Sequence, residues 1–162
     1  MEAAPLKDIR AELKTLSEKE LQDIILRLGR FKKDNKELLT YLLFEEGDEH
    51  GFVTQCKETM DAQFAEIVSR SYYQSKKSVR KILSRTKKII RYSSSKETEV
   101  ELLLHFCRNM LHRFPYMDQY SPLANIFTRQ YEMCRRKLDK LHEDLAFDYL
   151  QEWKALKGQD ED

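Results

Sequence analysis

SPLANIFTRQYEMCRRKLDKLHEDLAFDYLQEWKALK, residues 121–157, decides the fold class of this chain. Its large apolar residues recur at steps of three or four throughout, which is the period of one face of an α-helix. Ser121 is expected to cap this stretch with Pro122 at the first helical position, and no glycine or proline follows before Gly158. One unbroken helix would be about 50 Å long, more than a compact domain of this size spans. We therefore expect a kink near His142, several shorter helices, or a protruding end.

The rest of the chain repeats this helical pattern. Residues 17–20 (SEKE) and 34–37 (DNKE) have the pattern of capping boxes, in which the first side chain accepts a hydrogen bond from the fourth backbone N–H. Apolar periodicity predicts helices over residues 6–16, 21–28, 38–43, 52–69, 72–92 and 96–114. The chain has only four glycines and three prolines, which favours long uninterrupted elements.

We predict an all-α protein from these patterns. Its 162 residues suit a single compact domain of about six to eight antiparallel helices over residues 1–157. An irregular bundle and a short stack resembling helical repeats both fit, in either case with a long C-terminal helix. Residues 158–162 are expected to form an acidic, disordered tail.

Composition narrows the expected location. No apolar run approaches the 18 or so residues that cross a bilayer, and the first ten residues lack a secretory signal pattern. The three cysteines are an odd number spread over helical stretches, which suits a reducing compartment. We therefore expect a cytoplasmic protein that makes no use of a membrane.

The strongest functional signal is a basic block at residues 70–96. It holds ten lysines and arginines and no acidic residue, whereas the whole chain carries a net charge of only +1. At 100° per residue, Val79, Ile82 and Ile89 fall on one stripe, and the charges cover the remaining surface of the helix. The candidate anion-binding residues are Lys77, Arg80, Lys81, Arg85, Lys87, Lys88 and Arg91, together with the aromatic Tyr73 and Tyr92.

Like charges four residues apart repel on a helix, so this face needs an explanation. One explanation is internal pairing with acidic residues elsewhere in the chain, for which the candidates are Glu45, Glu46, Asp48, Glu49, Glu97, Glu99 and Glu101. The other is an external polyanion. Repeated cations along a helix match a row of phosphates, and the two tyrosines could stack on unpaired bases. An acidic protein is also compatible.

The C-terminal residues Phe147, Leu150 and Trp153 form a second candidate surface. They widen the apolar face of the last helix. Either they are buried against the N-terminal helices, or they form a homodimer or partner interface. A protein–protein scaffold, with the basic face merely solvated or internally paired, is accordingly the alternative to a nucleic-acid-binding module.

Catalytic and metal-binding patterns are weak. His50, His105, His112 and His142 lack the spacing of zinc ligands, and neither a glycine-rich phosphate loop nor a nucleophile elbow occurs. The aromatic loop at residues 113–122 is expected to close the end of a helix pair, or else to rim a pocket. We expect a protein that is not an enzyme and carries no cofactor or metal.

Overall fold

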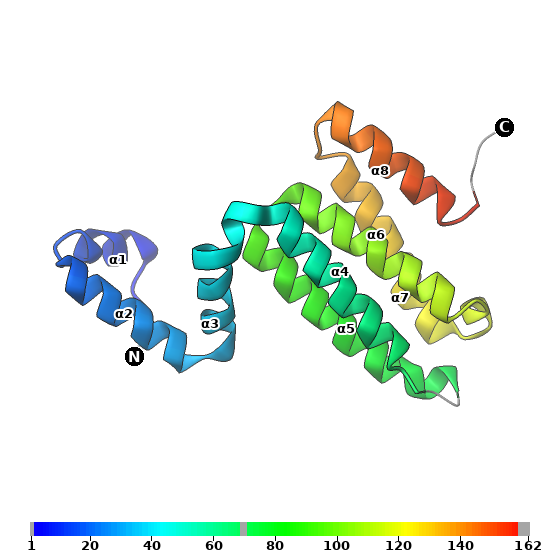
Figure 1. The fold of residues 1–162 in the computed structure, drawn as a ribbon, viewed down its shortest axis with the longest axis horizontal. Helices are drawn as coiled ribbons and strands as arrows, with labels where there is room; N and C mark the ends of the chain where they lie inside the picture. The colour runs from blue at the N-terminus through cyan, green and yellow to red at the C-terminus, as the bar shows by residue number, and fades with distance from the viewer. Residues whose placement is uncertain (1, 69–70, 159–162) are drawn as a thin grey trace. The chain divides into compact units, whose positions relative to one another are not determined.

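The structure is a computed structural model, which describes residues 2–68 and 71–158. Within these ranges the regular elements are helical, and no strand occurs (Figure 1). The elements are α1 (Leu6–Leu13), α2 (Glu18–Phe31), α3 (Lys33–Thr40), the π-helical turn η1 (Tyr41–Glu45), the 3-10 turn η2 (Glu46–Asp48), α4 (Glu49–Ala65), α5 (Tyr72–Ser93), α6 (Lys96–Arg113), the 3-10 turn η3 (Met117–Gln119), α7 (Ser121–Leu138) and α8 (Glu143–Ala155). The prediction of an all-α fold is confirmed.

The chain divides into two compact units, residues 1–44 and 45–162. This division is based on contacts within the chain, and the expected single domain over residues 1–157 remains a prediction. Of the expected tail, only Gly158 belongs to the part of the chain that the structure describes, so the prediction for residues 159–162 lies outside it.

The first unit contains α1, α2 and α3. The capping box at the start of α2 is confirmed: the Ser17 hydroxyl accepts from the Glu20 N–H, and the Glu20 carboxylate accepts from the Ser17 N–H. Leu39 of α3 packs close to Gly29 of α2, where a Cβ atom would lie 3.0 Å from the leucine Cδ1. None of the residues in α1, α2 and α3 is buried.

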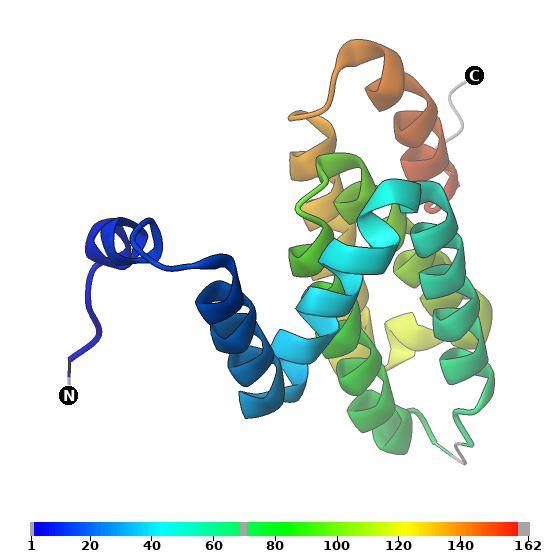
Figure 2. The ribbon, with the colours of Figure 1, turned by 60° about the vertical axis from the view of Figure 1, so that its left-hand side comes forward.

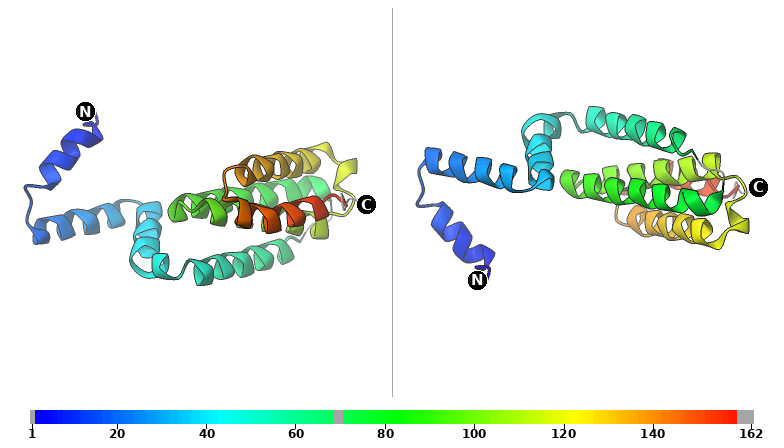
Figure 3. Two further views of the ribbon diagram at one scale, coloured as in Figure 1. Left: turned by 90° about the horizontal axis from the view of Figure 1, so that it is seen from above. Right: turned by 90° about the horizontal axis from the view of Figure 1, so that it is seen from below.

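The second unit is a bundle of α4 to α8 (Figures 1 and 3). α6 is its central helix and packs against α4, α5, α7 and α8. Leu102, Leu103, Leu104, Phe106 and Cys107 are consecutive or nearly so, and all are buried. Since five such residues cannot share one face of a helix, α6 is covered on more than one side.

The C-terminal region is helical as expected, but it consists of two helices that turn back on each other (Figure 2). α7 ends at Leu138, and His142 is the N-cap of α8 with its Nδ1 accepting from the Asp144 N–H. Of the three alternatives, the structure therefore has shorter helices, and the break between them ends at His142. Trp153 of α8 stacks on Tyr131 of α7 with 4.3 Å between the ring centroids.

Two predicted caps are wrong. α3 begins at Lys33, before Asp34, and its N-cap Lys32 makes no side-chain hydrogen bond. α7 begins at Ser121 itself, with Tyr120 as the N-cap and no side-chain cap. Polar residues near a helix start suit more than one position, and the chain on either side selects between them.

Candidate polyanion-binding surface

α5 carries the basic block, and its ends are set locally. The Ser71 hydroxyl accepts a hydrogen bond from the Gln74 N–H at 3.4 Å and so caps the first turn. At the other end Ser94 adopts a left-handed conformation with φ of 58°, and its N–H donates to the Ile90 carbonyl at 3.2 Å. The 22 residues between form a rod about 33 Å long.

One stripe of α5 faces the core of the second unit. Ser75, Val79, Ile82 and Thr86 are buried at spacings of four, three and four residues. The two buried hydroxyl groups are satisfied within the helix, because Ser75 donates to the Ser71 carbonyl and Thr86 donates to the Ile82 carbonyl. With this stripe inward, the opposite face of α5 must point away from the core.

The predicted binding residues divide into two groups on that outer surface. Tyr73, Lys77, Arg80, Lys81, Lys87 and Arg91 are exposed. The ring of Tyr73 is the most accessible aromatic of the helix, with 72% of its surface exposed. Arg85, Lys88 and Tyr92 are half-buried and interact with other parts of the chain. The structure therefore separates six solvent-facing candidates from three that also serve the fold.

The position of Arg85 shows what this second group does. Burial raises the pKa of the Cys56 thiol on α4 to about 11, and the Arg85 charge opposes that rise. The carboxylates of Glu49 and Glu45 act on the same thiol in the opposite sense to Arg85. Arg85 thus lies beside α4, where its charge is partly balanced inside the unit.

Most of the acidic residues considered as internal partners are engaged elsewhere. Glu99 pairs with Lys137 of α7 at 2.8 Å, and Glu101 pairs with Lys57 of α4. Glu97 accepts a hydrogen bond from the Tyr149 hydroxyl of α8 at 3.0 Å. These three carboxylates hold α6 against its neighbouring helices, and they do not neutralise the positive charge on the outer face of α5.

Glu49 and Asp48 lie near the C-terminal end of α5, where their carboxylates accept hydrogen bonds at the ends of helices. Glu49 accepts hydrogen bonds from the hydroxyl groups of Ser93 and Thr98, across the turn between α5 and α6. Asp48 caps α4 by accepting from the Gly51 N–H at 3.0 Å. Among the salt bridges found within residues 2–68 and 71–158, none involves Lys77, Arg80, Lys81, Lys87 or Arg91.

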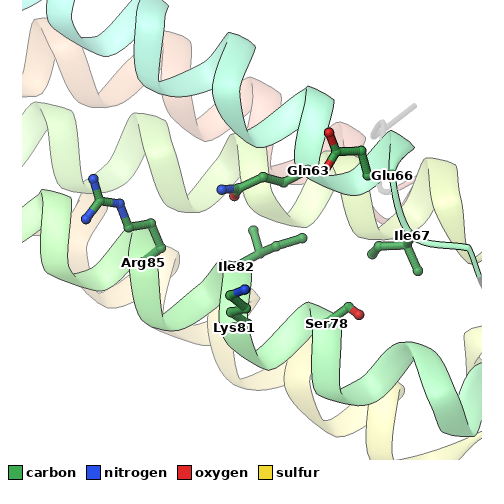
Figure 4. Close-up of a pocket in the computed structure, with 7 residues that line it drawn as sticks. All are labelled: Gln63, Glu66, Ile67, Ser78, Lys81, Ile82 and Arg85. Carbon is green, nitrogen blue, oxygen red and sulfur yellow. The ribbon is translucent and has the colours of Figure 1, made fainter.

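A shallow groove of about 310 Å³ runs between α4 and α5 (Figure 4). Ser78, Lys81, Ile82 and Arg85 line it from α5, and Gln63, Glu66 and Ile67 line it from the opposite side. The two cations and the hydroxyl can hold an anionic group at the edge of the exposed basic face.

A polar cluster that sequence reasoning missed lies between α4 and α6. The Nε2 of His105 lies 2.5 Å from Asp61 Oδ1, and Asn109 donates to the same carboxylate oxygen at 2.7 Å. His112 and Arg113 line the same groove of about 500 Å³. Asp61 and His105 are 44 residues apart, so no spacing pattern could have joined them. Within the described residues, no group of three or more His, Cys, Asp or Glu is placed to hold a metal.

The aromatic loop after α6 has a structural core. Phe114 is buried and meets the Tyr72 ring edge-to-face at 5.4 Å, and the Tyr72 hydroxyl accepts from the Tyr116 N–H. These contacts fasten the start of α5 to the end of α6, as expected for a loop that closes a helix pair. The Tyr116 ring itself remains exposed.

The C-terminal candidates differ from one another. Trp153 is half-buried, stacks on Tyr131 and donates to the Tyr131 carbonyl at 2.9 Å, and Leu150 packs against the same core. Phe147 remains 62% exposed. We expected these three side chains to be buried against the N-terminal helices. In the structure, Trp153 packs instead against α7 and α6. Phe147 is the residue of the three that stays available to a partner.

No protein-family model, no curated protein and no solved structure matches this chain. No helix among residues 2–68 and 71–158 is long and apolar enough to cross a membrane.

Proposed function

We propose that this protein is a non-catalytic helical binding module, and that the outer face of α5 binds nucleic acid through its phosphates. The observation that carries the proposal is the row of exposed cations Lys77, Arg80, Lys81, Lys87 and Arg91 on one straight helix. The carboxylates of Glu97, Glu99 and Glu101 have partners on other helices, which leaves this row to an outside anion.

The length of the row suits a nucleic-acid strand. Lys77 and Arg91 are separated by about 21 Å along the helix axis. Phosphates along one strand of a duplex advance by about 3.4 Å, so the row runs alongside roughly six of them. Contacts of this kind depend little on sequence, because phosphates carry no base identity.

The energetics of the free helix point the same way. Lys77–Lys81 and Lys87–Arg91 are like-charged pairs four residues apart, each costing about 0.2–0.5 kcal/mol. Phosphates would convert this repulsion into attraction and release condensed counterions, which gives affinity that falls steeply with salt. Tyr73 adds an exposed ring at the N-terminal end of the row, where an unpaired base can stack on it.

Fluorescence anisotropy with labelled single- and double-stranded DNA and RNA tests the proposal. With about five phosphates neutralised, the affinity for duplex DNA should fall several-hundredfold between about 50 and 200 mM salt. Lys81→Glu combined with Lys87→Glu should weaken binding at 50 mM salt at least tenfold and reduce the slope of log K against log salt by about two. Both positions are exposed, so the double variant should keep its fold.

A matched control is Arg129→Glu combined with Lys140→Glu, which changes the net charge equally at exposed positions outside α5. It should bind almost as the unchanged protein does. Equal losses in the two double variants would mean that net charge, and not α5, governs binding. Absence of binding at 50 mM salt would overturn the proposal.

Tyr73→Ala separates base stacking from phosphate contact. It should weaken single-stranded binding roughly tenfold, since one stacked base contributes about 1–3 kcal/mol, and should leave duplex binding nearly unchanged. Loss on duplex alone would contradict a stacking role.

A protein–protein scaffold is the second candidate. Phe147 of α8 is 62% exposed, and its ring is an apolar group that a partner protein could cover. An acidic protein docking on α5 would appear in the same anisotropy experiment as binding to labelled polyglutamate without binding to nucleic acid. The three cysteines, none of them in a disulfide, are compatible with the cytoplasmic location that we include in the proposal.

A further inference from the structure

The first unit has an apolar helix face that its own helices leave open. Leu21, Ile24, Ile25, Leu28 and Phe31 fall within about 120° around the axis of α2, a stripe of the width that normally meets a core. Yet no residue of α2 is buried, and Phe31 is 75% exposed. The sequence builds a packing surface here, and residues 2–44 do not cover it.

The contact between α2 and α3 takes place at one edge of this stripe. Leu39 of α3 meets Gly29, and the Asn35 side-chain amide donates to the Leu28 carbonyl at 2.8 Å. Gly29 lies about 160° from Phe31 around the helix axis. α3 therefore covers the flank beyond Ile25, and the flank beside Phe31 remains open.

The charges along the open flank are ordered. Glu20 and Asp23 occupy it in the first half of α2, and Arg27 and Arg30 occupy it in the second half. All four fall within about 80° of one another beside the apolar stripe. The flank is thus acidic at one end of the helix and basic at the other.

This order is self-complementary only when two copies run in opposite directions. A two-fold axis near Ile25 sets Asp23 opposite Arg27 of the second copy, and Glu20 opposite Arg30. The same operation brings Leu21 toward Leu28 of the second copy, which closes an apolar seam. In a parallel pair this flank would instead meet the opposite flank of the second helix, so Asp23 would not lie opposite Arg27 or Glu20 opposite Arg30. In antiparallel pairs of helices the same flank of each helix faces its counterpart, as this arrangement requires.

We propose that α2 is a homodimerisation helix, which pairs antiparallel with α2 of a second copy of this chain. The α2 stripe forms the centre of this interface, and exposed apolar side chains of the neighbouring helices extend it. Large apolar side chains are exposed throughout residues 2–44: Leu6, Ile9, Leu13, Ile24, Ile25, Leu26, Leu28, Phe31, Leu38, Leu42, Leu43 and Phe44. At about 150 Å² for each fully exposed side chain, they present roughly 1,000 Å² together, and those of the α2 stripe present roughly 300 Å² of it. A stable interface needs about 800 Å² from each partner, so side chains around the stripe contribute as well.

Sedimentation equilibrium of the full chain tests this pairing. The chain mass is 19.4 kDa, and the unchanged protein should sediment with twice that mass at micromolar concentration. Asp23→Arg places arginine against arginine at two symmetric points, and Arg27→Asp places aspartate against aspartate. Each variant alone should dissociate at least tenfold more readily than the unchanged protein.

An equimolar mixture of the two variants is the decisive sample. One copy then carries arginine at both positions and the other carries aspartate at both, so the mixture should regain dimers with the original affinity. Lys19→Glu is the control: Lys19 lies on the side of α2 away from the stripe, and this change should leave the dimer intact.

Three results would overturn the proposal. These are a monomeric unchanged protein at high micromolar concentration, a charge-reversed variant that stays as dimeric as the control, and an equimolar mixture that stays monomeric. Far-ultraviolet circular dichroism of each variant confirms that α2 remains helical. Since neither Asp23 nor Arg27 belongs to α5, failure of this test leaves the proposed nucleic-acid binding untouched, and failure of that binding leaves the dimer.

Discussion

The two units of this chain are built from helices of the same amphipathic kind, yet they use their apolar faces differently. In α1, α2 and α3 no side chain is buried, whereas α6 alone buries eight residues. Two phenylalanines mark the extremes: Phe31 in α2 is 75% exposed and Phe106 in α6 is 0% exposed. An amphipathic pattern predicts that a helix has a face to bury; only the neighbouring helices determine whether that face is covered.

This difference in burial also means that the two units differ in hydrophobic stabilisation. Apolar area removed from water contributes about 25 cal/mol per Å², so the second unit holds most of the hydrophobic stabilisation of the chain. The first unit depends on local hydrogen bonds, such as the Ser17–Glu20 box, and on a partner for its stripe.

Phe106→Ala against Phe31→Ala is the most direct comparison. Loss of the fully buried Phe106 ring, which meets Phe64 edge-to-face at 5.5 Å, should lower the free energy of unfolding by about 3–5 kcal/mol. Phe31→Ala should change it by less than about 0.5 kcal/mol in dilute protein, where the proposed dimer has dissociated. Urea unfolding followed by circular dichroism measures both, and similar losses would contradict the contrast between the units.

Trp153→Ala tests α8, which has no buried residue although it belongs to the second unit. The half-buried indole stacks on Tyr131 and donates to its carbonyl, so its loss should cost about 2 kcal/mol, less than a fully buried aromatic. Phe147→Ala on the same helix is the control and should cost under about 0.5 kcal/mol. Equal free energies of unfolding for the two variants in urea would show that the Trp153 indole does not hold α8 against α7.

Ser95→Ala removes the cap of α6, where the hydroxyl accepts from the Thr98 N–H at 3.2 Å. The global free energy of unfolding should fall by about 1 kcal/mol, because α6 is the centre of the core. Ser17→Ala removes the equivalent cap of α2, and its effect should stay local, as faster amide hydrogen exchange in α2. A global loss from Ser17→Ala equal to that from Ser95→Ala would show that the units unfold together.

Alkaline pH should weaken the second unit selectively, since all three cysteines lie in it. Burial raises the pKa of Cys56 from 9.0 to about 11, so between these values the unfolded chain releases a proton that the native chain keeps. The free energy of unfolding should therefore fall as pH rises from 9 to 11. The pKa of Cys107 is also raised, by its contact with Cys134 and then by burial.

Cys56→Ala should make this decline shallower without abolishing it, because Cys107 and the half-buried Tyr149, whose pKa values are also raised, still contribute. Urea unfolding at pH 8, 9, 10 and 11 measures the slope. Identical slopes with and without the Cys56 thiol would contradict its burial.

Much of the helical pattern was predictable because it rests on bonds between close neighbours. The ends of α5 and α6 lie within one residue of the predicted bounds, since serines at 71 and 95 and the proline at 115 act locally. The outer position of Lys77, Arg80 and Arg91 followed from the inward turn of Val79 and Ile82. The expected caps at Asp34 and Ser121 failed, because several polar residues compete near those helix starts.

The apolar periodicity of the sequence could not predict two other features, the burial around α6 and the turn between α7 and α8. The pattern of α6 predicted one stripe, and the burial of Leu102 and Phe106 outside it depends on helices that come from both earlier and later in the chain. The apolar period also runs on across Asp139–His142, where the chain turns back into α8. Compactness selects that turn, because a straight helix would leave Trp153 without its partner Tyr131.

The helices, their amphipathic faces and the row of cations on α5 follow from local sequence alone. These depend on residues no more than four positions apart, whose geometry a single helix dictates. Packing between helices sets the partners of the carboxylates on α6, the central position of α6, and the exposure of the apolar stripe on α2. Such choices join residues more than 40 positions apart, as in Lys57–Glu101 and Asp61–His105, and their free energy depends on burial that exists only once the helices have packed.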